Sequence, residues 1–347
     1  MSKRRWLAIL VALALLSAVG VTPASAGHGV NGKVCIVNDI GGGEDPFRES
    51  AAAGAKQAEA KLHVEVVTLD ADTEAEVLAN IDAFVTGGCD LIIGIAFIVA
   101  GLMEPFIDGN PDQQFAVIDF TFFGAYPNVA EVQFRSDQSA FLAGYIAAGI
   151  SETGEVGVFG GLPIPAVTIF MDGYALGVHY YNAQYGTTVE VLGWDPDLQT
   201  GLFSFDFQDP AAGQAIAADL YDLGADTVFP VAGRTGYGSL DEAELRKQAG
   251  ESVRVIGVDF DWADEFGDPD RVILTSVVKD FGVAVFNQAA AIADGTWQGG
   301  EVWEDLESGA VDIAPFAKTN RQVPGFLKND LKDIRAGIID ESIATMP

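Results

Sequence analysis

Short apolar segments alternate with longer amphipathic segments from Lys33 onward, and this alternation restricts the possible fold more than any other feature. Segments such as 91–95 and 114–118 are almost wholly apolar, which is typical of parallel strands covered on both faces. Segments such as 49–62 and 73–86 are amphipathic and predict helices that cover such a sheet. The pattern therefore predicts an α/β architecture.

The alternation occurs in two successive series, with a long helix predicted at 136–150 between them. In the first series we expect strands at 33–38, 63–69, 91–95 and 114–118, and helices at 49–62, 73–86 and 98–110. In the second we expect strands at 156–159, 188–192, 227–230 and 253–258, and helices at 169–182, 211–223 and 242–249. A strand at 274–277 and a helix at 281–293 follow. Two such series predict two doubly wound lobes with parallel sheets.

The first residues contain the three parts of a secretory signal peptide in order. Lys3, Arg4 and Arg5 precede an apolar run at 6–21, and Ala24-Ser25-Ala26 supplies the small residues of a cleavage site. The alternative is a membrane anchor, which would need about 20 apolar residues to span a bilayer. We expect cleavage near Ala26 and an extracytoplasmic protein, and the lack of a nearby cysteine argues against a lipid anchor at that site.

These features predict four parts of the chain. Residues 1–26 form the signal peptide, and 27–150 form an N-terminal lobe to which part of the C-terminal region returns. Residues 151–275 form a C-terminal lobe, and 276–347 contain a hinge crossover and C-terminal helices.

The chain is strongly acidic, with 50 acidic and 19 basic residues. Loss of the three basic residues of the signal leaves 16 against 50, a net charge of −34. Binding to phosphate backbones requires the opposite charge, so we exclude nucleic acid and an anionic membrane surface as partners. The simplest interpretation is a solvated surface suited to solubility or to high salt.

Two cysteines, Cys35 and Cys89, remain after export into a compartment that permits disulfides. Cys35 lies in the first predicted strand and Cys89 just before the third, and these strands are neighbours in a doubly wound lobe. A disulfide would close a loop of about 55 residues and stabilise the fold by roughly 3–4 kcal/mol. Two buried free thiols are the alternative.

Polar residues follow several predicted strands at the edge of the sheet where ligands bind in open α/β folds. Asp39 follows the first strand together with Asn38, Asp119 follows 114–118, and Asp259 and Lys279 follow 253–258 and 274–277. Any one of these carboxylates could serve only as a helix cap or turn residue. Together they predict a cleft between the lobes that binds a polar ligand.

Seven motifs occur in an order that resembles the purine nucleoside receptor, or basic membrane protein (BMP), family of ABC transporter substrate-binding proteins. The motifs are VNDIGGGEDPFRESAAAG (37–54), PNVAEVQFRSDQSAFLAGYIAA (127–148), GEVGVFGGLPIPAVTIFMDGYALGVHYYN (154–182), FQDPAAG (207–213), GADTVFPVAGRTGYG (224–238), VIGVDFDW (255–262) and LTSVVKDFGVAVFN (274–287). The resemblance extends over nearly the whole mature chain.

This resemblance implies a type I periplasmic-binding-protein fold that closes over a nucleoside, with a purine favoured. It also implies ABC permease subunits as partners, a monomer and no cofactor. Aromatic rings stack on the base and carboxylates accept from ribose hydroxyls in such proteins, which agrees with the chemistry of both groups. By this resemblance Phe47 and Phe207 form the stacking pair, with Asp39 and Asp119 acting in the first lobe. The resemblance assigns Gly233, Asp259 and Lys279 to the second lobe.

Several positions depart from the family pattern. Arg48 stands where Asn is usual after the first motif's Phe, and Arg234 replaces a Gly in the second-lobe turn. Pro163 and Phe120 replace an Asp and a small residue. Because arginine binds carboxylate and phosphate groups, Arg48 and Arg234 could determine specificity, and a receptor for another polar or anionic ligand stays an alternative.

The sequence offers little for an enzyme. His28, His63 and His179 have no partner at metal-ligand spacing, and neither a nucleophile elbow nor a phosphate-binding glycine loop is present. A hydrolase acting on nucleosides is therefore a remote alternative, and we expect no catalytic residue and no metal. A sensory protein that presents its ligand to a membrane receptor would use the same fold.

Overall fold

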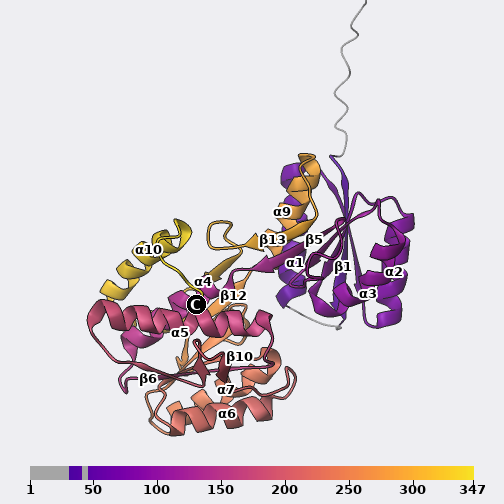
Figure 1. The fold of residues 1–347 in the computed structure, drawn as a ribbon. Coiled ribbons are helices and arrows are strands. Elements are labelled where there is room, and N and C mark those ends of the chain that lie inside the picture. Colours follow the sequence, from indigo (N-terminus) through magenta and orange to yellow (C-terminus); the bar gives the residue numbers. More distant parts are fainter. Residues whose placement is uncertain (1–30, 41–45) are drawn as a thin grey trace, which may run out of the picture.

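The computed structural model describes residues 31–40 and 46–347, so the predicted signal peptide lies outside the described residues. Figure 1 shows two lobes, each with strands flanked by helices. Each lobe is built on a six-stranded sheet. This arrangement confirms the predicted α/β fold with two lobes of mainly parallel strands.

The first sheet has the strand order β13-β5-β4-β3-β1-β2, with all neighbours parallel. Its strands are β1 (Lys33–Ile40), β2 (Glu65–Ala71), β3 (Leu91–Ile95), β4 (Gln114–Ile118), β5 (Val129–Phe134) and β13 (Gly300–Glu304). Four helices cover it: α1 (Pro46–Leu62), α2 (Glu74–Thr86), α3 (Ala96–Gly109) and α9 (Phe281–Ala293). Helices α1 and α9 pack together on one face, and α2 and α3 lie together on the other.

The second sheet has the order β14-β12-β11-β10-β6-β7, in which only β14 is antiparallel to its neighbour. Its strands are β6 (Glu155–Gly160), β7 (Glu190–Leu192), β10 (Thr227–Val231), β11 (Arg254–Asp259), β12 (Ile273–Lys279) and β14 (Val311–Ile313). Its helices are α4 (Ser136–Ile150), α5 (Pro165–Tyr185), α6 (Pro210–Asp222), α7 (Tyr237–Gln248), α8 (Trp262–Glu265) and α10 (Gly325–Ile339), and a hairpin of β8 (Trp194–Asp195) and β9 (Thr200–Gly201) lies beside α5.

Three segments connect the lobes, between β5 and α4, between β12 and α9, and between β13 and β14. Backbone hydrogen bonds hold these segments side by side. Arg135 N donates to Glu304 O at 2.7 Å, and Asp280 N donates to Ala310 O at 2.7 Å. Crossovers of this kind are where two lobes can rotate against each other.

The structure corrects the predicted boundary at residue 150. Helix α4 packs along α5 and beside β12 and β14, so it lies with the second sheet, and the first crossover occurs near Arg135. Gly144 makes this packing possible, because a side chain there would overlap the carbonyl of Tyr174. The second lobe also extends past residue 275 to the end of β12, and α9 and β13 return to the first sheet.

Cys35 and Cys89 are joined in a disulfide that ties β1 to the residues before β3. Within 31–40 and 46–347, no helix is long and apolar enough to cross a bilayer.

Candidate functional site

Three of the four predicted strand-end groups meet at one point. Lys279 Nζ lies 2.7 Å from Asp119 Oδ2 and 3.2 Å from Asp259 Oδ1. Asp119 follows β4 in the first lobe, whereas Asp259 and Lys279 end β11 and β12 in the second. This cluster, the strand-end cluster, therefore combines side chains from both lobes.

Asp119 and Asp259 both have left-handed backbone conformations, with φ of 64° and 72°. Residues other than glycine adopt this conformation at a cost, and they retain it where the surrounding structure holds them, often at binding sites. The two aspartates thus share both their place at a strand end and an unusual local geometry.

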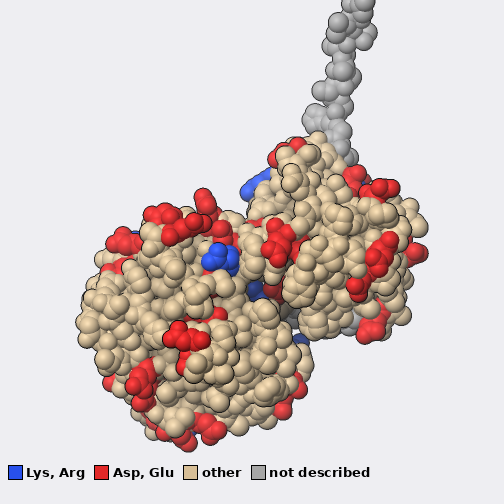
Figure 2. All heavy atoms as spheres, in the orientation of Figure 1, with Lys and Arg blue, Asp and Glu red and all other residues tan. Residues whose placement is uncertain are grey.

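Charge attraction and hydrogen bonds from Asp119 and Asp259 stabilise the charged form of Lys279. Burial alone would lower the pKa of Lys279, whose side chain is 7% exposed, but the charges and hydrogen bonds of Asp119 and Asp259 raise it above its ordinary value. Burial raises the pKa of Asp259, which the charge of Lys279 only partly offsets. With both carboxylates ionised, the cluster carries one net negative charge. Figure 2 shows a few basic atoms in and near the hollow between the lobes, and acidic side chains scattered over both lobes.

Four phenylalanine rings surround the ammonium group of Lys279. The centroid of the Phe170 ring lies 5.4 Å from Nζ, and those of Phe47, Phe134 and Phe281 each lie 5.9 Å away. Phe47 stacks on Phe281 with centroids 4.6 Å apart, and Phe281 stacks on Phe134 at 5.3 Å. The predicted stacking residue Phe47 therefore lies beside the charged cluster.

Phe207 and Gly233 lie together in the second lobe. The ring of Phe207 covers Gly161 at the end of β6, where a side chain would overlap it. Gly233 follows β10 with φ of 54°, and a Cβ there would lie 3.6 Å from Phe207 Cβ. The predicted stacking pair is thus divided between the lobes, with Phe47 on α1 in the first and Phe207 in the second.

The remaining predicted residues have different surroundings. Arg48 Nη1 lies 3.8 Å from Asp70 Oδ1, which also accepts a hydrogen bond from Asn38 Nδ2. Arg234 is exposed in the 3-10 helix Gly233–Gly236 after β10. Asp39 belongs to β1, but its side chain lies outside the described residues.

Sequence reasoning missed Phe134, Phe170 and Phe281 at this site. Phe134 ends β5, which was not predicted as a strand because Glu131 and Gln133 interrupt its apolar pattern. Phe281 comes two residues after Lys279, so the strand-end argument could have included it. Phe170 lies in a predicted helix, and nothing local distinguished it.

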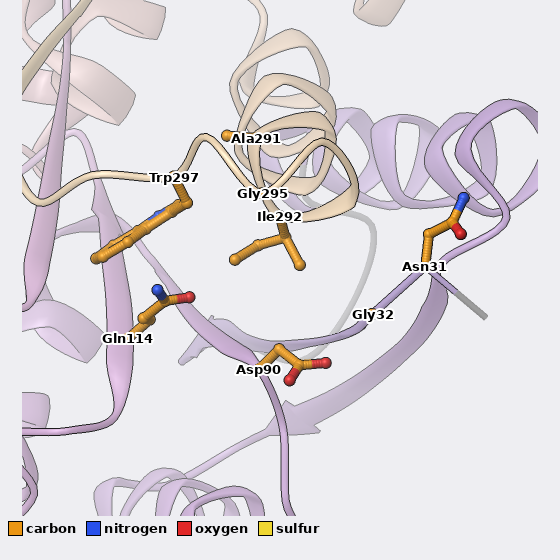
Figure 3. Close-up of a pocket in the computed structure, with 8 residues that line it drawn as sticks. All are labelled: Asn31, Gly32, Asp90, Gln114, Ala291, Ile292, Gly295 and Trp297. Carbon is orange, nitrogen blue, oxygen red and sulfur yellow. The ribbon is translucent and has the colours of Figure 1, made fainter. Parts of the chain in front are cut away.

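A separate cavity of about 410 Å³ lies at the opposite end of the first sheet (Figure 3). Asn31, Gly32, Asp90 and Gln114 line it from the beginnings of β1, β3 and β4, and the end of α9 with Trp297 closes the other side. Because it lies at the amino ends of the strands, it is distinct from the strand-end cluster.

Comparison with known proteins identifies the family. Residues 33–342 match the Bmp family, described as PnrA-like ABC transporter substrate-binding proteins. The chain belongs to this family. This match confirms the resemblance carried by the seven motifs. Members of the Bmp family are substrate-binding proteins rather than enzymes. Substrate-binding proteins of ABC importers act outside the cytoplasm, in agreement with the predicted export.

Bmp relatives match over most of the chain. Basic membrane protein A of Borreliella burgdorferi is 28% identical over 316 residues, covering 90% of this chain and 86% of that protein. The ABC transporter nucleoside-binding protein BmpA of Lactococcus lactis is 27% identical and covers 99% of each chain. An uncharacterized lipoprotein of Pyrococcus horikoshii is 28% identical over 87% of this chain and 76% of its own.

Solved structures of ABC solute-binding proteins share the fold. One from Aeropyrum pernix K1 superimposes with a TM-score of 0.71 at 26% identity, covering 90% of this chain and 92% of that one. One from Conexibacter woesei gives 0.68 at 20% identity, covering 91% and 98%. These likenesses confirm the type I periplasmic-binding fold.

Proposed function

We propose that this chain captures a nucleoside, with a purine favoured, in the cleft between its lobes and delivers it to the permease of an ABC importer. The observation that carries the proposal is the strand-end cluster, because Asp119 comes from one lobe and Asp259 and Lys279 from the other. A ligand bound there contacts both lobes.

The chemistry of the cluster suits a neutral ligand rich in hydroxyl groups. Ionised carboxylates only accept hydrogen bonds, so Asp119 and Asp259 match ribose hydroxyls, which donate them. The net negative charge of the cluster disfavours an anionic ligand. The rings of Phe47 and Phe207 supply flat apolar faces of the kind that stack on a purine base.

The mechanism that we propose is closure about the three crossovers. Each lobe holds its own part of the site rigidly, and the ligand binds most tightly when both parts face it together. Binding then shifts the population toward the closed form, which the permease recognises. The name of the Lactococcus lactis relative, a nucleoside-binding protein, supports this choice of ligand.

A thermal-shift panel tests the ligand. Purine nucleosides should raise the melting temperature, because a ligand at 100 times its Kd stabilises the folded state by about 2.7 kcal/mol. Nucleotides, sugars and amino acids should give smaller shifts. A shift with a sugar or amino acid and none with any nucleoside would reject the nucleoside assignment.

Variants test the site. Phe47→Ala and Asp259→Ala should abolish the nucleoside shift, whereas Phe326→Ala, a matched change at a half-exposed ring on α10, should keep it. Chromatography of inosine or guanosine incubated with the protein should recover the intact nucleoside; release of free base would instead indicate a hydrolase.

A further inference from the structure

Glu131 is a fully buried carboxylate in the middle of β5, and it holds the loop that carries Asp119. Its Oε2 accepts a hydrogen bond from Thr121 Oγ1 at 2.6 Å. The backbone N–H of Gly124 donates to Oε1 at 3.1 Å and to Oε2 at 3.3 Å. One buried side chain thus holds two points of the loop that runs from Asp119 to Gly124.

This loop has an unusual backbone. Asp119, Phe123 and Gly124 all have positive φ, at 64°, 57° and 72°. Asp119 N donates to Val132 O at 2.8 Å, so the beginning of the loop is bound to the residue that follows Glu131. Thr121 Oγ1 also accepts from Phe123 N at 2.8 Å, which links the hydroxyl to the strained part of the loop. Such conformations persist where neighbouring groups hold them.

We propose that Glu131 is a positioning residue for ligand binding, which acts through Thr121 and Gly124 to hold Asp119 toward Lys279. The inference rests on the proposed function of the strand-end cluster. Glu131 itself does not contact the cluster in this assignment; it fixes the loop whose first residue forms the 2.7 Å bond between the lobes.

We call Glu131 with its two donors, Thr121 and Gly124, a clamp, because one buried carboxylate holds a loop. The second lobe contains a similar clamp, which lies away from the strand-end cluster. Asp226, which is 2% exposed, accepts from Ser151 Oγ at 3.0 Å and from the backbone N–H groups of Glu152 and Thr153 at 2.6 and 3.1 Å. It immediately precedes β10, at the amino end of the second sheet. Like Glu131, Asp226 is a buried carboxylate that accepts from one hydroxyl and from backbone N–H groups. The loop that it holds carries no proposed ligand group.

The two clamps define a binding experiment. Because removal of Glu131 would leave the Thr121 hydroxyl and the Gly124 N–H without their shared acceptor, the test changes Thr121 instead. Thr121→Val should weaken guanosine or inosine binding about tenfold by calorimetry, and Thr121→Ser, which keeps the hydroxyl, should restore affinity to within about twofold. Ser151→Ala should lower the melting temperature without changing affinity. Equal affinity of wild type and Thr121→Val, or failure of Thr121→Ser to restore it, would overturn the proposal.

A second measurement needs no ligand and separates this inference from the proposed function. Lys279→Met should cost less stability in the Thr121→Val background than in the wild type, because the clamp no longer holds Asp119 toward the lysine. The same cycle with Ser151→Ala should be additive. If the wild type binds no nucleoside but the Thr121–Lys279 coupling is present, the ligand assignment fails and the clamp stands. Additivity in both cycles would reject the clamp.

Discussion

The sheets of the two lobes have the same strand order, so residues at the ends of corresponding strands can be compared directly. In the orders β2-β1-β3-β4-β5-β13 and β7-β6-β10-β11-β12-β14, strand β4 corresponds to β11, and β5 corresponds to β12. Asp119 and Asp259 therefore occupy corresponding places, both with positive φ. The next position differs, because β5 ends in Phe134 and β12 ends in Lys279.

This difference gives the two aspartates different tasks. Asp259 and Lys279 belong to paired strands of one sheet, so rotation of the lobes leaves their contact unchanged. The bond from Asp119 to Lys279 joins the lobes, so the same rotation changes it directly. Lys279 comes from the second lobe, and the first lobe has no lysine at the corresponding position. Asp119 and Asp259 therefore differ, because only Asp119 contacts Lys279 across the two lobes.

Removal of the cation should have the largest effect on this comparison. Lys279→Met leaves two partly buried carboxylates facing each other, and loss of one partner of a buried pair costs about 3–5 kcal/mol, less where solvent reaches the carboxylates. We expect lower stability in denaturant and no nucleoside shift. Lys332→Met on the exposed side of α10 is the control, and equal behaviour of both variants would contradict the prediction.

The disulfide lies in the first lobe, so removal of the disulfide should destabilise that lobe and leave the second lobe unchanged. Cys35 and Cys89 are 54 residues apart, and a closed loop of this size stabilises by about 4 kcal/mol in the chain-entropy model. Replacement of both by Ser should lower the free energy of unfolding by about this amount while nucleoside affinity changes little. Two reactive thiols in the denatured, unreduced wild type would remove the basis of this prediction.

Neutralising each aspartate tests their unequal tasks. Asp119→Asn weakens the bond between the lobes, whereas Asp259→Asn leaves that bond in place. Because hydrogen bonds to charged groups contribute about 1.5–3 kcal/mol when buried, we expect a loss near the lower end for the more exposed Asp119. Small-angle scattering of the ligand-free proteins should show a larger radius of gyration for Asp119→Asn only. The same expansion in both variants would make the aspartates equivalent.

The smallest expected effect is on pH dependence. Burial raises the pKa of Asp259 above its ordinary 3.8, so its contribution to stability is present below that pH and is lost as pH rises through the folded-state pKa. The melting temperature of Asp259→Asn should therefore rise relative to that of the wild type as pH increases from 3.8.

Asp340 supplies the opposite control for this titration. Hydrogen bonds from Ser342 lower its pKa, so the stability that it contributes is present above pH 3.8 and is lost as pH falls. Asp340→Asn should accordingly lose stability relative to the wild type as pH increases. A Tm difference that does not vary with pH for Asp259→Asn would contradict the assignment of its raised pKa.

Local patterns were sufficient to predict most strands and helices. The apolar runs that form β3 and β4 and the helices α4 and α9 have the predicted bounds, since a buried parallel strand and an amphipathic helix each have their own periodicity. Strand β5 was missed because Glu131 points a carboxylate into the protein, where Thr121 and Gly124 satisfy it. Strands β13 and β14 were missed as short strands within the last part of the chain.

The sequence by itself therefore determined the order of most helices and strands, the family and the polar residues that follow the strands. Only the tertiary structure decided that α4 lies with the second lobe, that α9 and β13 are the part of the C-terminal region that returns to the first, and that four phenylalanines surround Lys279. The physical reason is that periodicity reports the burial of one element, whereas the strand order of each sheet determines which elements meet. Asp119 and Lys279 are 160 residues apart in the chain, and the crossovers bring them within hydrogen-bonding distance.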